Sequence, residues 1–551
     1  MKAPRSAAIA GAAHMLPAGV ALAAVGAQAA YRPLQTGVAV LIGLAFAAAS
    51  ASATPSGSDA VPQRAPIRDR RDRRGRPRGR LAGALVVLAV GAAYFATLSP
   101  TTNATDSIEF QLVAATLRIA HAPGYALYTL LGHVFTRLPV ADVAWRMNLL
   151  SASCGTVAAA LAFTLARRLA NDPLAGVVAA LAMAFTPQLW SQAVITEVYT
   201  LNVVLVLGVL ACLAHLRRRP TRSPNARLSV AAVPVGSGRT DAVWRLSALT
   251  LAGLGFTHHL TTVFLYPVVA WLVLCRDPKL LTRPGDVARS ALAFIVGLAP
   301  LLYFPWRWQA VNGTALDVPT LFGYVTGRNY PGLFDLSRLP AEPARWGLLR
   351  HAIVTAFGPL TLVLAAVGIA ALAARRRFDW AVALAAVICA YAAFYLGYFA
   401  WDGWVVLLPA LAALAIASGI GAAAAAMSLG PTARRSPFRR AAVAAVCSGA
   451  VAVSLAHAWP RVDASRGWSG QAAADAALAE PIPQGARLVV HPSVGAGFLY
   501  AHHLMGVRPD LDVVYADWPA GRRALADPLS EDRPVVAYGI ARDVLPSIGV
   551  R

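Results

Sequence analysis

Residues 68–98 read RDRRDRRGRPRGRLAGALVVLAVGAAYFATL, an arginine-rich tract followed directly by a run that carries no charge. A helix that spans a bilayer needs about 20 mostly apolar residues, and residues 81–98 come close to that length. Lys and Arg gather on the cytoplasmic side of membrane helices. The stretch therefore predicts the first span of a membrane protein, with its arginine tract in the cytoplasm.

The composition of the whole chain agrees with a membrane protein. Hydrophobic residues make up 57% and charged residues only 14%, whereas soluble chains average about 25% charged residues. The mean hydropathy is +0.56. The net charge of +23 would suggest nucleic acid in a soluble protein, but here the basic residues stand in short clusters between apolar runs. We therefore expect no nucleic-acid partner. The cysteines fall in apolar runs without metal-ligand spacing, so we predict neither disulfides nor metal ligands at Cys154, Cys212, Cys275, Cys389 and Cys447.

Apolar runs continue after the first one and predict an all-α polytopic bundle of about 11, and up to 13, transmembrane helices. The basic clusters that follow every second span keep each of those loops in the cytoplasm, which leaves the loops at 99–143 and 306–346 outside. The candidate spans are 81–98, 144–166, 173–187, 199–215, 245–258, 260–275, 287–305, 347–373, 379–399, 404–427 and 441–459.

The two ends of the chain differ from this middle part. Within residues 1–80, Ala-rich stretches at 7–30 and 36–53 precede the arginine-rich cytoplasmic linker. They fit a helical hairpin, which we favour, a signal peptide with an A-x-A site at 27–29, or a weakly structured extension. Residues 460–551 lose the membrane signal and predict a small extracytoplasmic α/β region after the membrane domain at 81–459. Its predicted elements are strands at 488–490, 513–515 and 535–538 and a helix at 497–505.

The first long outer loop contains two carboxylates three residues apart. On a helix, Asp106 and Glu109 share one face, and a carboxylate in a partly dry cleft is a natural general base for a hydroxyl. The pair also fits an N-cap aspartate with a first-turn glutamate, so the spacing leaves both interpretations open. Pro123-Gly124 favours a tight turn, and we expect residues 106–138 to form two short helices along the outer surface. His121, before that turn, is a candidate ligand or proton carrier, although a lone histidine is more often structural.

Further polar residues fall on the same predicted side of the membrane. Glu197 enters the fourth span, where an ionisable group costs about 2.5–3.5 kcal/mol on insertion scales and usually faces a cavity or a partner. Arg307 and Arg328 lie in the third long outer loop, and Arg328 is a candidate partner for a phosphate. Asp402 follows the ninth span. This convergence predicts a site on the outer face, but it does not separate an enzyme from a transporter.

Several of these stretches together resemble a known membrane family. They run in collinear order from about Asp106 to Pro409, which makes the set more specific than any one motif. On these motifs the chain resembles the protein O-mannosyltransferase-like polytopic membrane family, among the GT-C glycosyltransferases. The stretches are DSIEF (106–110), IAHAPGYALYTLLGHVFTRLP (119–139), WRMNLLSA (145–152), WSQAVITEVYTLN (190–202), GLGFTHHLT (253–261) and YVTGRNY (324–330).

The resemblance implies a GT-C fold, a polyprenyl-phosphate-linked sugar donor and an acid of the first outer loop as catalytic base. Asp106 matches the base, with Glu109 as the second acid. Ile108 stands where the family motif has Gly, and Ala122 where it has Pro. With Arg307 and Asp402 added from their loops, the predicted substrate-binding residues are His121 and Tyr125 (H-x-P-G-Y), Glu197 and Tyr199 (E-x-Y), His259 (H-L), and Arg328 and Tyr330 (G-R-x-Y).

We therefore predict a metal-independent, inverting glycosyltransferase without a cofactor, in the cell membrane, with its site on the extracytoplasmic side. Its predicted partners are the lipid-linked donor, the bilayer and an acceptor protein or glycan; mannose as the sugar follows only from the resemblance. The alternative is a transporter or flippase of lipid-linked saccharides, which also needs polar groups at membrane depth. A transporter should show internal repeats related across the membrane, and the sequence shows none.

Overall fold

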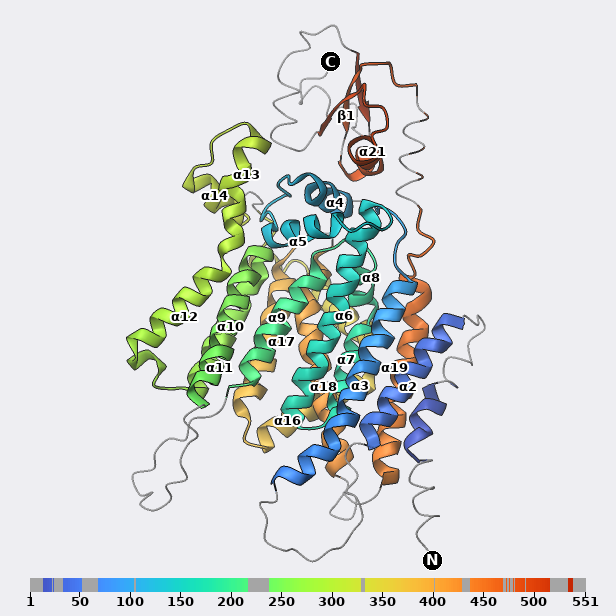
Figure 1. Ribbon diagram of the computed structural model, residues 1–551, viewed down its shortest axis with the longest axis vertical. Helices are drawn as coiled ribbons and strands as arrows, with labels where there is room; N and C mark the ends of the chain where they lie inside the picture. The colour runs from blue at the N-terminus through green and yellow to red at the C-terminus, as the bar shows by residue number, and fades with distance from the viewer. Residues whose placement is uncertain are drawn as a thin grey trace, which may run out of the picture.

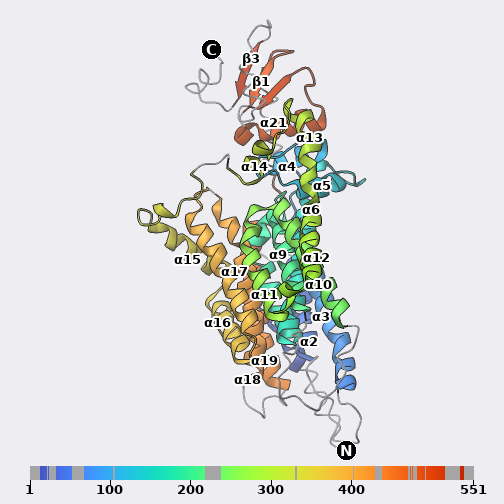
Figure 2. The same cartoon turned by 90° about the vertical axis from the view of Figure 1, so that its left-hand side faces the viewer.

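The computed structural model describes residues 13–51, 68–216, 237–428, 437–468, 481–515 and 534–538. Gaps within these ranges fall at 22, 24–32, 104–105, 329–331, 401 and 491, and residues 472, 475 and 479 are described singly. The described chain is mostly helical, and its helices form an elongated bundle with a small sheet beyond one end of the long axis (Figures 1 and 2). All five cysteines are free, as the sequence predicted.

Within the described residues, six helices are long and apolar enough to cross a membrane, and three bent pairs raise the number to nine. The bend is 70° in the pair α7–α8, 45° where α12 meets the segment formed by η3 and α13, and 95° in the pair α15–α16. The predicted span at 347–373 is therefore not one straight helix. The six long helices are α2 (Pro33–Ala51), α3 (Arg68–Ala96), α6 (Val143–Ala170), α17 (Phe378–Gly397), α18 (Leu408–Ser428) with the 3₁₀ turn η5 (Gly403–Leu407) before it, and α19 (Pro437–Val462).

The remaining predicted spans correspond to the 22-residue helix α10 (Ser237–His258) and to shorter or bent segments. Apolar helices at 199–214 and 260–276 are shorter than a full crossing. The described helices and 3₁₀ turns between α6 and α17 are α7 (Pro173–Ala184), α8 (Pro187–Ala193), α9 (Tyr199–Ala214), α10 (Ser237–His258), η1 (Leu260–Leu265), α11 (Tyr266–Arg276), η2 (Leu280–Thr282), α12 (Pro284–Gly297), η3 (Ala299–Leu302), α13 (Tyr303–Asn312), α14 (Val318–Val325), η4 (Leu336–Arg338), α15 (Ala344–Ala356) and α16 (Pro359–Ala374).

The centre of the bundle is α18, of which 94% of the best membrane window is buried inside the protein. Small residues let its backbone approach its neighbours closely. A Cβ at Gly421 would collide with the carbonyl oxygen of Leu364 on α16, and one at Gly419 would collide with that of Ala175 on α7. Small residues at contacts are the usual way for membrane helices to pack, because apolar burial adds little driving force inside lipid.

The described part of the N-terminal segment consists of two helices that pack against each other. Residues 13–21 are helical and run antiparallel to α2. His14 Nδ1 lies 3.0 Å from Ser50 Oγ, and Ala18 contacts the backbone at Gly43. This helix pair also touches α19, because the hydroxyl of Ser448 donates to the carbonyl of Pro17 at 2.9 Å.

Two short helices lie across one end of the bundle, as predicted for residues 106–138 (Figure 1). They are α4 (Asp106–Thr116) and α5 (Ala126–Thr136). The turn between them needs Gly124, which has a φ of +91° and sits so close to Phe304 and Tyr324 that any Cβ would strike their rings. Predicting a turn at Pro123-Gly124 was therefore correct.

The C-terminal region carries a three-stranded parallel sheet of order β2-β1-β3, from β1 (Arg487–Val490), β2 (Asp512–Tyr515) and β3 (Val535–Tyr538). Helix α21 (Pro492–Met505) connects β1 to β2 and packs onto α4. Phe498 and Leu499 of α21 share an apolar cluster with Leu112 of α4, and the amide of Ala144 donates to Tyr500 Oη at 3.1 Å. The α/β elements match those expected from the sequence and cover the outer side of the helix that carries Asp106.

Candidate active site

Helix α4 is tied to the bundle by a chain of buried polar groups. The hydroxyl of Ser107 donates to the carbonyl of Thr196 at 2.9 Å, and Gln111 Nε2 donates to Thr196 Oγ1 at 2.9 Å. Thr196 Oγ1 in turn donates to Asn148 Oδ1 at 2.6 Å, on α6. Asn148 Nδ2 is close to the carbonyls of Ser99 and Thr101, both at 3.0 Å. This network fixes the position of α4, and with it the two half-buried acids Asp106 and Glu109.

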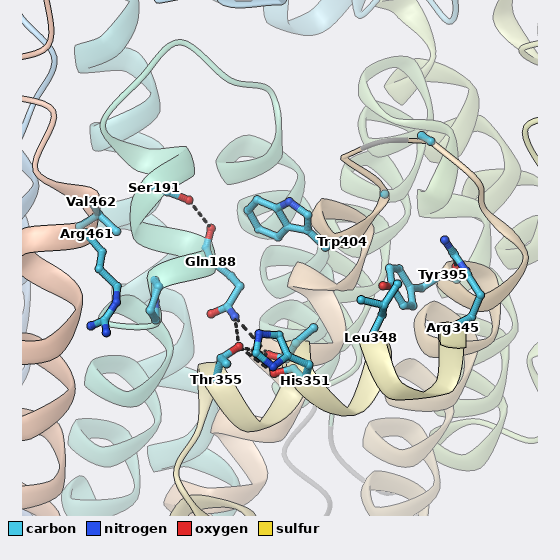
Figure 3. Close-up of a pocket in the computed structure, with 14 residues that line it drawn as sticks. Gln188, Ser191, Arg345, Leu348, His351, Thr355, Tyr395, Trp404, Arg461 and Val462 are labelled. Atoms are coloured by element: carbon cyan, nitrogen blue, oxygen red, sulfur yellow. Dashed lines mark hydrogen bonds between the residues drawn. The ribbon is translucent and has the colours of Figure 1, made fainter. Parts of the chain in front are cut away.

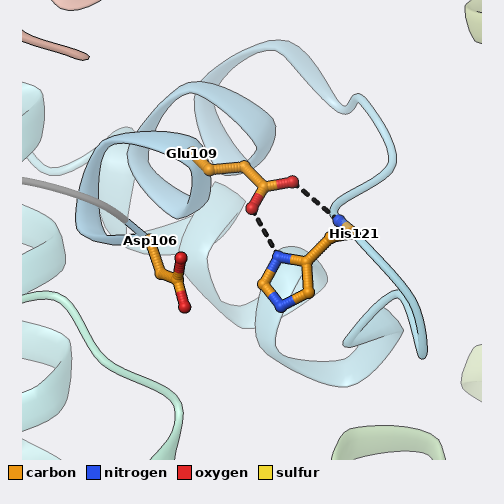
Figure 4. A group of neighbouring side chains, drawn as sticks. All are labelled: Asp106, Glu109 and His121. Atoms are coloured by element: carbon orange, nitrogen blue, oxygen red, sulfur yellow. Dashed lines mark hydrogen bonds and ion pairs between the residues drawn. The ribbon is translucent and has the colours of Figure 1, made fainter. Parts of the chain in front are cut away.

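Those acids meet His121 at the end of the α4–α5 turn (Figure 4). Glu109 accepts twice from His121: the backbone amide lies 2.7 Å from Oε1, and ring Nδ1 lies 2.5 Å from Oε2. The Asp106 carboxylate lies beside this pair, since ligand atoms of all three residues fall within 4.8 Å of one another. Glu109 therefore orients the imidazole, while Asp106 has no hydrogen bond to either residue.

The charges of this cluster act on one another strongly. Burial alone would lower the pKa of His121, but the carboxylates of Glu109 and Asp106 outweigh it and raise that pKa to about 9. His121 is therefore an imidazolium near neutral pH. Burial raises the pKa of Asp106 above its ordinary value, His121 opposes part of the rise, and Glu109 and Asp402 add to it. A carboxylate with a raised pKa is a stronger base than one free in water.

An aromatic series connects this cluster to Asp402. The ring of His121 lies 5.3 Å from that of Tyr125, and Tyr125 lies 6.1 Å from His259. His259 is 5.7 Å from Tyr199, whose hydroxyl donates to Asp402 Oδ2 at 3.3 Å. The structure thus brings together predicted site residues from four distant segments, while burial raises the pKa of Asp402.

Glu197 lies before α9 rather than inside it, and is 8% exposed. Ser151 clamps its backbone, accepting from the Glu197 amide and donating to its carbonyl, both at 3.1 Å. Carboxylate oxygen Oε2 has no partner among the described residues. Burial, with Asp106 and Asp402, raises the pKa of Glu197 well above its ordinary value. A buried carboxylate oxygen without a partner is a candidate group for hydrogen bonding to a ligand.

The predicted basic residues of the outer loop lie apart from the carboxylates. Arg307 Nε donates to the carbonyl of Leu117 at 2.8 Å, so Arg307 of α13 supports the end of α4. The hydroxyls of Tyr303 and Tyr324 donate to carbonyls of the same turn, at Arg118 and Ala120. Arg328 is exposed after α14, with its guanidinium 5.5 Å from the Phe322 ring. Tyr330 lies outside the described residues.

Sequence reasoning missed the residues that hold the site. Ser107, Gln111, Asn148, Ser151 and Thr196 are buried and hydrogen-bonded around α4 and Glu197. The signal was present, because polar residues inside apolar runs need partners. Their partners lie 46–89 residues away in the sequence, however, so the pairing was not visible.

Asp106, Glu109 and His121 are also the one described group of three or more acid, histidine or cysteine side chains compact enough to hold a metal ion. Nδ1 of His121 already faces Glu109 Oε2, however, and a raised pKa keeps a proton on the imidazole. A cation bound by all three side chains would have to displace that proton. The chemistry of the group therefore favours a carboxylate–imidazolium pair.

A cavity of about 480 Å³ is lined in part by the loop that carries Asp402 (Figure 3). Ala400, Gly403 and Trp404 of that loop line it, together with side chains of α8 and α15. Gln188 Nε2 donates to Thr355 Oγ1 at 2.9 Å and so links those two helices. Ligand sites typically measure about 300–1,000 Å³ and combine apolar walls with a few polar groups, a description that fits this cavity.

These features define an integral membrane protein with a carboxylate-rich site at one end of its helical bundle. Residues 106–282 match the family model of the protein O-mannosyl-transferase TMEM260 N-terminal domain. Two curated relatives carry that name: the mouse protein O-mannosyl-transferase TMEM260, 30% identical over 276 residues, and its Dictyostelium discoideum counterpart, 24% identical over 247. The matches cover 47% and 44% of this chain. The resemblance predicted from the motifs is confirmed over this region.

The matched regions make up 36% of the mouse protein and 29% of the Dictyostelium protein, so the match spans about a third of these relatives. Among solved structures, ArnT from Cupriavidus metallidurans bound to undecaprenyl phosphate is 14% identical, with a TM-score of 0.48 over 82% of this chain and 89% of that one. The Archaeoglobus fulgidus oligosaccharyltransferase in the apo form is 12% identical, with a TM-score of 0.44 over 80% and 65%.

Proposed function

We propose that this chain is a GT-C type glycosyltransferase that moves a sugar from a polyprenyl-phosphate donor to an acceptor hydroxyl. The observation that carries the proposal is the Asp106 carboxylate, which has a raised pKa and lies beside the Glu109–His121 pair at one end of a membrane bundle. The family match covers this same segment. By that likeness the sugar is mannose and the acceptor is Ser or Thr of a protein, at the extracytoplasmic face of the cell membrane.

The reaction we propose is a single displacement. Asp106 takes the proton of the acceptor hydroxyl while the acceptor oxygen forms a bond to the anomeric carbon. The bond from that carbon to the phosphate oxygen breaks, and the lipid phosphate leaves with the electron pair, so the configuration inverts. A general base of this kind typically contributes about 10²–10⁴-fold. Burial suits Asp106 to the task, because it raises the basicity of the carboxylate.

Glu109 and His121 influence the proposed base, Asp106, without forming a hydrogen bond to it. Glu109 accepts one hydrogen bond from the His121 ring and one from the His121 backbone amide, so both of its carboxylate oxygens are already engaged. The imidazolium charge of His121 opposes part of the rise that burial causes in the pKa of Asp106. The buried Glu197, whose Oε2 has no partner among the described residues, and the half-buried Asp402 supply hydrogen-bonding groups for sugar or substrate hydroxyls. We keep Arg328 as the proposed partner of the phosphate.

For the lipid part of the donor we propose the 480 Å³ cavity, because it shares the 400–404 loop with Asp402. Replacing Ala352, which lines it, by Phe should fill the cavity and raise the donor KM with little change in kcat. Val354→Phe is the matched control, because Val354 lies on the same helix, is 49% exposed and does not line the cavity. Equal effects of both variants would place the lipid elsewhere.

The direct test is sugar transfer by the purified full-length protein from polyprenyl-phosphate mannose to an acceptor peptide, compared with Asp106→Asn. We expect transfer by the native chain and a loss of about 10²–10⁴-fold in the variant, with donor binding kept. A chelator should leave the rate unchanged. No transfer, combined with movement of the lipid-linked sugar across a vesicle membrane, would instead establish the transporter alternative.

A further inference from the structure

A second cavity, of about 580 Å³, lies at the opposite end of the bundle from α4 and α5. It sits between the C-terminal ends of α6 and α9 and the start of α17. Three arginines line it, Arg167, Arg168 and Arg377, together with His215 and Asn171. Its volume falls within the range of about 300–1,000 Å³ that small-molecule sites occupy.

The depth of this cavity is set by α6, whose first turn lies under α4. With 28 residues and a rise of about 1.5 Å per residue, α6 is about 42 Å long. The hydrocarbon core of a bilayer is about 30 Å thick. The last turn of α6, which carries Arg167 and Arg168, therefore reaches the headgroup layer. The ring of His215 stacks on that of Trp244 with 4.1 Å between centroids, and tryptophans favour that same layer.

Backbone contacts hold two of the guanidinium groups in place. Arg168 Nε donates to the carbonyl of Ala214 at 2.7 Å and so links α6 to α9. Arg377 Nη1 donates to the carbonyl of Leu169 at 2.9 Å and links α17 to α6. These bonds fix the side chains at the cavity wall. A fixed planar guanidinium is the best side chain for a phosphate, because it offers several N–H donors in one plane.

The charge at this cavity is left uncompensated at Arg167. Arg167 makes no hydrogen bond or ion pair with any described residue; its guanidinium packs close to Gly79 on the arginine-rich start of α3. No carboxylate stands among the described lining residues. Asp172, next to the lining residue Asn171, is buried and accepts from both terminal nitrogens of Arg440, at 2.5 and 2.7 Å.

We propose that this cavity binds a phosphate-bearing anion, and that the headgroup of an anionic phospholipid supplies it. The cavity lies in the headgroup layer, and its wall presents two fixed guanidinium groups and a third, Arg167, that has no partner among the described residues. Basic pockets between membrane helices are known to suit anionic headgroups. The site differs from the carboxylate site in its ligand and lies about one membrane thickness away from it.

Native mass spectrometry of the detergent-purified full-length protein tests the proposal. Phosphatidylglycerol, phosphatidylcholine and inorganic phosphate are added in separate arms. We expect saturable binding of phosphatidylglycerol, at least five-fold tighter than that of phosphatidylcholine. Arg167→Gln should weaken it about five-fold, since one basic residue near the headgroups contributes about 1 kcal/mol. Arg167→Lys should restore most of the loss.

The matched control is Arg376→Gln, which removes the same charge at the same end of the bundle from an exposed residue that does not line the cavity. It should leave lipid binding unchanged.

Equal weakening by Arg376→Gln and Arg167→Gln overturns the proposal, because lipid binding then depends on the total positive charge at this end of the bundle and not on the cavity. Equal binding of both phospholipids, with no phosphate binding, overturns it too. Saturable binding of inorganic phosphate that Arg167→Gln removes, without lipid preference, supports the site and assigns a soluble phosphate. Thermal unfolding of each variant checks that it is folded.

Discussion

The two ends of α6 lie in regions of opposite charge: acidic residues gather near its start, and arginines near its end. At its start, the acids Asp106, Glu109, Glu197 and Asp402 gather beside one imidazolium, and the pKa values of Asp106, Glu197 and Asp402 are raised by burial. At its end, Arg167, Arg168 and Arg377 line a cavity, and the neighbouring Asp172 is fully paired with Arg440.

The difference separates structural from reactive carboxylates. Asp172 is buried and lies between guanidinium nitrogens, which is how a protein stabilises a charge that it needs only for folding. Asp106 has no guanidinium partner among the described residues, and burial raises the pKa of its carboxylate. An ionisable group whose pKa is shifted by burial, and which no ion pair stabilises, is the better candidate for a catalytic role.

The largest effect should come from Asp106→Asn. We expect transfer to fall by about 10²–10⁴-fold, since the variant keeps the shape of the side chain and removes the base. Glu109→Gln should reduce transfer less, because Glu109 acts through His121. Initial rates of both variants with the lipid-linked donor measure this. The reverse order of effects would assign the base to Glu109.

Asp172→Asn should separate stability from activity at the other end. Removing one partner of a buried ion pair typically costs about 3–5 kcal/mol, and the Arg440 guanidinium would be left without its acid. The transfer rate per folded molecule should stay unchanged. Arg338→Gln is the control, because its pair with Glu342 is exposed and such pairs contribute at most about 1 kcal/mol. Denaturation in detergent measures both, and a stable Asp172→Asn would contradict the assignment.

The Glu109–His121 pair predicts a pH dependence of stability. The pKa of His121 is raised from 6.5 to about 9 in the folded protein, so its contribution is fully present below pH 6.5 and is lost as the pH rises through about 9. At 1.36 kcal/mol per unit, the contribution is at most about 3 kcal/mol. The midpoint of unfolding should be higher at pH 6 than at pH 10 in the unsubstituted protein. In Glu109→Gln the two midpoints should differ less. The same difference in the variant would rule the pair out as its source.

The smallest effect should come from Thr196→Val, which breaks the network under α4. The hydroxyl of Thr196 connects Gln111 to Asn148, and leaving such buried groups unsatisfied costs about 1–3 kcal/mol. We expect lower stability and a modest loss of transfer, because α4 becomes free to shift. Thr156→Val is the control, since its hydroxyl bonds only within its own helix. If Thr196→Val and Thr156→Val had the same transfer rate, the network would not position α4 for transfer.

Local sequence was enough to predict much of the fold. The apolar runs and charge clusters predicted the helices α3, α6, α17, α18 and α19. The Pro123-Gly124 turn predicted the short pair α4–α5, and short apolar runs predicted the C-terminal strands. They did not predict the 95° bend between α15 and α16. Nor did they predict that Arg307 would support Leu117, because a run of sequence carries no information on which distant carbonyl a side chain will meet.

By itself, the sequence determined that this protein lies in a membrane, because hydrophobicity and charge are properties of neighbouring residues. It also placed Asp106 and Glu109 on one helical face, because the helical repeat depends only on spacing. The tertiary structure decided the chemistry of those acids. The partner of Glu109 is fixed by the fold of the α4–α5 turn, the burial of Asp106 by the elements packed around α4, and the link from Tyr199 to Asp402 by the packing of α9 against the loop before α18. A pKa depends on all charges and surfaces within a few ångströms, and only the folded chain brings those together.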